Sequence, residues 1–162
     1  AQQVVEQIGK RKKYITDKTH AIGYTPKVAC IEWIDPIMAA GNWVPEMVEM
    51  CGGIPVTGEA GKHSLRSTIE EIAEKRPEKI IITPCGFSVE QSMKDTYVLT
   101  ENPLWSEIEA VKQGNVYVVD GNAYFNRPGP RIIDSLEIMA GIIQPEIFGE
   151  FMTENESIAK RL

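Results

Sequence analysis

The apolar positions along this chain alternate between helical and strand spacings. Residues 1–22 carry apolar side chains at helical spacings among many charged ones, with no proline, so they predict a helix. Three short apolar runs predict buried strands, at Lys27–Trp33, Lys79–Thr83 and Asn115–Asp120. Amphipathic patterns between and after these runs predict further helices, the last of them over residues 132–143.

Capping patterns place the starts of several of these helices. Ser67 and Glu70 have the spacing of a capping box, in which each side chain bonds the other residue's backbone N–H. Ser88 and Gln91 repeat that spacing. Asn102 precedes a proline and can cap a third helix.

Alternating strands and helices predict an α/β fold with a mostly parallel central sheet. We expect residues 23–148 to form one Rossmann-like, three-layer lobe, preceded by the long helix of residues 1–22. Residues 149–162 are expected to be a polar C-terminal tail. The length of 162 residues fits one such domain.

Composition narrows the classes of function. The net charge of -6 argues against a nucleic-acid-binding surface, and no apolar run is long enough to span a bilayer. The chain starts inside a predicted helix without a visible signal peptide, which suggests a piece cut from a longer precursor. Cys30, Cys51 and Cys85 form no CxxC pair, and only two histidines exist, so no metal site is predicted. Cys30 and Cys51 are expected to be buried.

Three segments follow the predicted strands, at residues 34–43, 84–87 and 121–130. In open parallel sheets, ligands bind beyond the carboxyl ends of the strands, which selects these segments as the candidate site. Five aromatic residues lie in or next to them: Trp33, Trp43, Phe87, Tyr124 and Phe125. Any one of them can pack on the core, but together they favour a large, flat, partly apolar ligand.

Signs of catalysis are weak. Cys85 stands at a strand end, where a nucleophile would be placed, but it lacks a neighbouring histidine, and Pro84 and Gly86 indicate a tight turn. Asp35 precedes Pro36, which favours a turn over acid–base work. His63 lies in a polar loop, where it would ligate a metal-centred ligand or be solvated. We therefore expect a binding protein, with an enzyme that uses Cys85 as the less favoured alternative.

Several motifs in order carry a family resemblance. They are Trp33-x-Asp35-Pro36, AGNWVPEM at 40–47, Gly52-Gly53, PCGF at 84–87 and DGNAYFNRPGPR at 120–131. From about Val28 to Phe148 the chain resembles the C-terminal lobe of class III ABC-transporter substrate-binding proteins, the cobalamin and iron-siderophore type. It is most similar to the cobalamin-binding family.

The resemblance implies a fold, a function and partners. In that family two Rossmann-like lobes are joined by a long helix, and the corrinoid bound between them is delivered to an ABC permease. Residues 1–22 would be the connecting helix, the N-terminal lobe of the parent protein is missing, and the location is extracytoplasmic, periplasmic or cell-surface anchored. The bound corrinoid is cargo, and no cofactor is expected. The implied ligand-binding residues are Trp33, Asp35, Trp43, Phe87, Tyr124, Phe125 and Arg127.

Some alternatives stay open. The resemblance assigns Glu70 to docking on arginines of the transporter, whereas the capping box would fold it back on its own helix. Ferric siderophores or haem are alternative ligands, and Arg127 would suit an anionic siderophore. The scarcity of other cations in the loops favours a corrinoid. A lobe that exposes half a cleft would also have apolar surface available for self-association.

Overall fold

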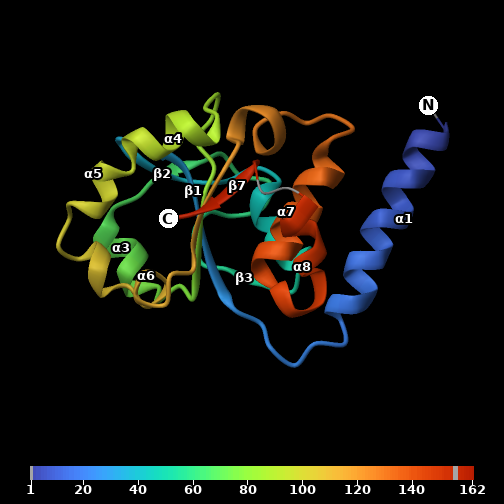
Figure 1. The fold of residues 1–162 in the computed structure, drawn as a ribbon, viewed down its shortest axis with the longest axis horizontal. Coiled ribbons are helices and arrows are strands. Elements are labelled where there is room, and N and C mark those ends of the chain that lie inside the picture. The colour runs from blue at the N-terminus through green and yellow to red at the C-terminus, as the bar shows by residue number, and fades with distance from the viewer. Residues whose placement is uncertain (1, 155–156) are drawn as a thin grey trace.

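The computed structural model describes residues 2–154 and 157–162, and it places helices on both faces of one sheet (Figure 1). The strands are β1 Lys27–Ile34, β2 Ile37–Ala39, β3 Ile54–Pro55, β4 Leu65–Arg66, β5 Lys79–Ile82, β6 Val116–Val119 and β7 Ala159–Arg161. The α-helices are α1 Gln2–Thr19, α2 Val44–Met50, α3 Ile69–Glu74, α4 Val89–Asp95, α5 Tyr97–Thr100, α6 Glu109–Lys112, α7 Ile132–Ile143 and α8 Pro145–Glu154. A 3₁₀ turn, η1 Trp105–Glu107, and a π-helical turn, η2 Gly121–Phe125, complete them.

The sheet has a parallel centre and antiparallel edges. Its order is β4-β2-β1-β5-β6-β7, with β3 beside the first residues of β1. The pairs β1–β5, β5–β6 and β1–β3 are parallel, while β2, β4 and β7 run antiparallel to their neighbours. The predicted α/β lobe with a mostly parallel central sheet is confirmed, with short antiparallel strands added at both edges.

Alternate side chains of the central strands fill two separate cores. Cys30 and Ile81 point into the core beneath α1, α2, α7 and α8. Ala29 and Ile80 point into the core beneath the helices from α3 to α6. This period-2 alternation on strands covered on both sides explains why the sequence of β5 is apolar at every position between Ile80 and Ile82.

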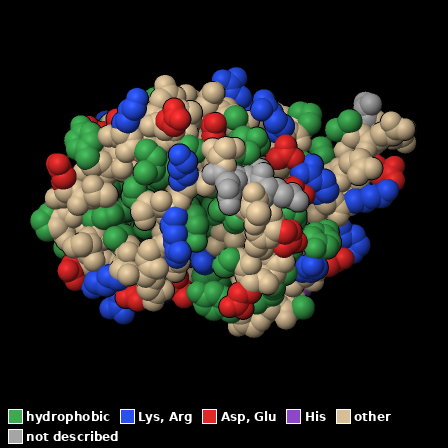
Figure 2. Space-filling view, in the orientation of Figure 1, with side chains coloured by type: hydrophobic (Ala, Val, Ile, Leu, Met, Phe, Trp, Pro, Cys, Tyr) green, Lys and Arg blue, Asp and Glu red, His purple; other side chains and the backbone are tan. Residues whose placement is uncertain are grey.

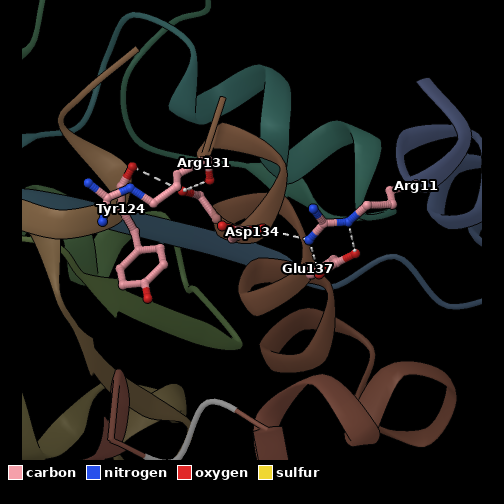
Figure 3. A network of polar contacts seen from close by, with 6 residues as sticks. Arg11, Tyr124, Arg131, Asp134 and Glu137 are labelled. Carbon is pink, nitrogen blue, oxygen red and sulfur yellow. Dashed lines mark hydrogen bonds and ion pairs between the residues drawn. The ribbon is translucent and has the colours of Figure 1, made fainter. Parts of the chain in front are cut away.

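Helix α1 is fixed to α7 by one arginine (Figure 3). Arg11 donates to both carboxylate oxygens of Glu137, at 2.7 and 2.6 Å, and to Asp134 at 2.6 Å. Hydrogen bonding to Glu137 is the main influence that raises the pKa of Arg11 above its ordinary value. One turn further along α1, Ile15 is fully buried in the core, so the second half of α1 packs as part of the lobe.

The first half of α1 extends beyond the body of the molecule, as Figures 1 and 2 both show. Val4 and Val5 on this half are 48% and 69% exposed. On the face seen in Figure 2, basic and acidic side chains are interspersed rather than gathered by sign. Among the described residues, no helix combines the length and apolar character needed to cross a membrane.

The capping box at α3 lies one residue later than the sequence predicted. Thr68 accepts from the backbone N–H of Glu71 at 3.2 Å, and the Glu71 carboxylate accepts from the N–H of Thr68 at 3.1 Å. Ser67 donates to that same carboxylate. The predicted pair of Ser67 with Glu70 is therefore wrong, because Ser and Thr are adjacent here, as are two glutamates. The second predicted box, Ser88 with Gln91, is confirmed.

Residues 149–162, predicted to be a polar tail, include the second part of α8 and the strand β7. Residues 145–154 form α8, which packs on α7 and buries Phe148 completely. The chain then returns to pair β7 antiparallel with β6 and buries Ala159. Residues 155–156 of the predicted tail lie outside the described residues.

Two further segments differ from expectation. The Asn102 side chain caps only a turn, accepting from the N–H of Leu104, and the predicted helix after it is divided into η1 and α6. The predicted loop after β1 contains the short strand β2, which folds back antiparallel on β1.

The capping box at α3 gives a stability prediction. Thr68→Ala removes the acceptor for the Glu71 N–H, so we expect a loss of about 1 kcal/mol in the free energy of unfolding. Ser67→Ala leaves both bonds of the box in place and should cost less. Urea unfolding of both variants measures this, and an equal loss for the two would contradict the assignment.

Candidate ligand-binding site

The three predicted strand-end segments meet at one edge of the sheet. The parallel strands β1, β5 and β6 all end there. The N–H of Cys85 bonds the carbonyl of Glu32 at 3.1 Å, which ties the segment after β5 to β1. The Asn126 amide donates to the carbonyl of Thr83 at 3.0 Å, which ties the segment after β6 to β5.

A glycine permits this close approach. A Cβ on Gly121 would lie 2.7 Å from the carbonyl oxygen of Thr83 and closer still to that of Pro84. The Asn126 amide also bonds the carbonyl of Gly121 and closes the π-helical turn from its far end. Asp120 accepts from the N–H of Ala123 and fixes the near end. The sequence DGNAYFN is thus folded into a compact turn against the end of β5.

The first hollow at this edge, which we call the strand-end hollow, is formed by all three segments. It has a volume of about 190 Å³ and is lined by Glu32, Gly41, Asn42, Trp43, Val44, Cys85, Phe125 and Asn126. The Trp43 indole N–H donates to the carbonyl of Phe125 at 3.0 Å, so the ring is held across the gap between α2 and η2. Ser64 donates to the Glu32 carboxylate at 2.8 Å and brings the loop before β4 to the same edge.

A second hollow, which we call the aromatic hollow, shares no residue with the first. It has a volume of about 210 Å³ and is lined by Trp33, Ile34, Asp35, Pro84, Phe87, Asp95, Tyr97 and Val98. The Trp33 and Phe87 rings are tilted by 57° with centroids 5.3 Å apart. The structure thus divides the predicted residues: Trp43 belongs to the first hollow, and Trp33, Asp35 and Phe87 to the second.

The other predicted ligand-binding residues line neither opening with a free side chain. The Phe125 side chain is fully buried in the core, and it contributes its carbonyl to the hollow. Arg127 is exposed but turned back on its own loop, where it donates to the carbonyl and side-chain oxygens of Asn122. Tyr124 is half-buried, with the Arg131 guanidinium 5.9 Å from its ring, at the start of α7 (Figure 3).

Sequence reasoning missed three polar residues of the strand-end hollow. Glu32 lies inside an apolar strand. Asn42 and Asn126 lie in the predicted strand-end segments, but only the aromatic residues of those segments were taken as ligand-binding candidates. Asn42 has a positive φ of 55°, which asparagine tolerates better than most residues. An asparagine beside a glycine, in a segment that follows a strand, was the available signal for Asn42.

The predicted docking residue, Glu70, is exposed on the first turn of α3. Glu71 takes the capping role in its place, so the Glu70 carboxylate has no hydrogen bond or ion pair to any described residue. Of the two roles that the sequence left open for Glu70, capping therefore falls to Glu71.

The cysteines divide into two buried and one exposed. Burial raises the pKa of the Cys30 thiol to about 12, and it also raises the pKa of Cys51. Cys85 is exposed at the strand-end hollow, whose lining includes no histidine. Within residues 2–154 and 157–162, no three His, Cys, Asp or Glu side chains gather as a metal site.

A family model described as periplasmic binding protein matches residues 1–123. The chain belongs to this family. Its members are extracytoplasmic binding proteins, and the matched relatives are binding proteins rather than enzymes, as the sequence predicted. One curated relative, a vitamin B12-binding protein of Vibrio vulnificus, is 28% identical over 104 residues, which is 62% of this chain and 33% of the relative.

Solved structures agree in fold. A TroA-like periplasmic binding protein, FepB of Veillonella parvula, matches with a TM-score of 0.75 and 17% identity over 99% of this chain and 55% of that one. The IsdE protein of S. aureus complexed with heme also has a TM-score of 0.75 and 17% identity, over 88% of this chain and 57% of that one. The chain thus spans about a third of the curated relative it matches and about half of these structures.

The different burial of Phe125 and Phe87 gives a prediction about protein stability. Phe125→Ala should destabilise the protein by about 3–5 kcal/mol, because it empties a fully buried site. Phe87→Ala removes a half-buried ring and should cost about 1 kcal/mol. Thermal or denaturant unfolding measures both, and equal losses would contradict the division.

Proposed function

We propose that this chain is the C-terminal lobe of the substrate-binding component of an ABC importer. In this role it holds one face of a corrinoid such as cobalamin and delivers it to the permease. The observation that carries the proposal is the strand-end hollow, where Trp43 is fixed by its bond to the Phe125 carbonyl beside the polar groups of Glu32, Asn42 and Asn126. A rigid aromatic ring among a few polar groups suits a large, partly apolar ligand.

The small volume of the strand-end hollow supports a binding site that two lobes share. Its volume of about 190 Å³ is below the roughly 300 Å³ at which pockets for drug-sized ligands begin. A corrinoid is larger than such ligands, so it would rest on this lobe and be enclosed by a second one. We propose that residues 1–22 connect the two lobes. The Arg11 clamp and buried Ile15 fit that role, because they fix one half of α1 to this lobe.

The charged residues around the strand-end hollow favour some classes of ligand over others. Its lining residues include no lysine or arginine, and the side chain of Arg127 is already bonded to Asn122. An anionic siderophore would be poorly compensated there. Haem is the second candidate, since one structural neighbour was solved with heme bound. We place the parent protein in the periplasm or anchored at the cell surface.

Ligand titration of the full-length protein tests the proposal. Cobalamin or cobinamide should bind and shift the corrinoid absorption spectrum, more tightly than haem or a ferric hydroxamate. Trp43→Ala should weaken binding by about tenfold or more, the equivalent of one lost aromatic contact. Tyr24→Ala is the control, because Tyr24 is an exposed aromatic before the opposite end of β1. No corrinoid binding at about millimolar concentration would overturn the proposal.

We propose that Glu70 docks the protein on the transporter by binding an arginine of the permease. The adjacent Glu71 provides a matched control variant. Glu70→Ala should weaken binding to the transporter in vesicles and leave stability unchanged, because this carboxylate has no described partner. Glu71→Ala should lower stability by about 1 kcal/mol and leave docking intact, because it breaks the capping box. Unchanged docking of the Glu70 variant would refute the assignment.

A further inference from the structure

The aromatic hollow combines features that corrinoid binding in the strand-end hollow does not need. Its lining comes from the end of β1, the segment after β5 and the junction of α4 with α5. Three of the lining residues are aromatic: Trp33, Phe87 and Tyr97. Two others, Asp35 and Asp95, are carboxylates. The sequence pointed to part of this set, but not to Asp95 and Tyr97, which lie beyond the strand-end segments.

Two of the three rings, Trp33 and Phe87, offer π surface rather than hydrogen bonds. The Trp33 indole N–H is already used, because it donates to the carbonyl of Asp35 at 2.9 Å. That bond fixes the ring against Phe87, whose centroid lies 5.3 Å away. Tyr97 is 56% exposed on α5 and completes the rim. Aromatic faces carry partial negative charge and attract cations.

The carboxylates are uncompensated. No described residue donates a hydrogen bond to the side chain of Asp35 or Asp95 or forms an ion pair with it, and no lysine, arginine or histidine is part of the lining. Lys94 precedes Asp95 in sequence but does not line the hollow. The lining therefore combines two carboxylates with three aromatic rings.

We propose that the aromatic hollow is a binding site for an alkylated organic cation, such as a quaternary ammonium group. Such a group is weakly hydrated, so it exchanges water for aromatic faces at low cost while the carboxylates neutralise its charge. The volume of about 210 Å³ suits one such group rather than a whole corrinoid. Calcium and magnesium prefer six or more oxygen ligands. Among the described residues, no three His, Cys, Asp or Glu side chains gather that could hold a metal ion.

Choline and its uncharged carbon isostere, 3,3-dimethyl-1-butanol, form a matched pair of probes. Each is titrated into the 162-residue chain while the indole N–H resonance of Trp33 is followed by NMR. We expect choline to shift this resonance and to bind at least about tenfold more tightly than the alcohol. Equal affinity for the two probes, or no shift at about 0.1 M choline, would overturn the proposal.

Single substitutions test whether choline binds in the aromatic hollow. Asp95→Asn and Tyr97→Ala should each weaken choline binding by roughly threefold to tenfold. Asp17→Asn, which changes an exposed carboxylate on α1, should leave it unchanged. Circular dichroism confirms that the variants are folded. Unchanged choline affinity in both hollow variants would also overturn the proposal. The choline titration contains no corrinoid, so its result is independent of the corrinoid titration that tests the proposed function.

Discussion

The contact between Gly121 and the carbonyl oxygens of Thr83 and Pro84 is the constraint on which the functional edge depends. Parallel pairing brings the ends of β1, β5 and β6 to the same edge, but it does not by itself close the gaps between the segments that follow. A residue without a side chain at position 121 lets the β6 segment lie directly on the β5 segment. Asn126 then locks the two together, and Trp43 reaches across to the carbonyl of Phe125.

Most of the architecture was predictable because it follows from periodicity. The central strands are apolar on both faces, and amphipathic helices separate them, which leaves few alternatives to a covered parallel sheet. The strand-end rule likewise located the site without knowledge of any side-chain contact. The short edge strands β4 and β7 were not predictable, since two or three residues carry no periodic signal and their pairing is decided by tertiary contacts.

Individual side chains were harder to place than segments. Phe125 and Phe87 look equivalent in sequence, yet one is buried in the core and the other borders an opening, because the π-helical turn points Phe125 inward. The shift from Glu70 to Glu71 in the capping box has a similar origin. Both glutamates have a hydroxyl residue three positions earlier, so the pattern allows two registers. The structure adopts the later register, in which Thr68 is the N-cap.

The short strand β7 has a consequence for how this sheet meets other molecules. Without it, β6 would present a row of unpaired backbone groups, a ready template for the strand of another chain. With it, the outermost strand is three residues long and carries Lys160 and Arg161, a sequence poorly suited to further pairing. The guanidinium of Arg161 also bonds the carbonyl of Gly114 and holds the strand in place. Residues 159–161 thus leave little unpaired backbone beside β6 for the strand of another chain.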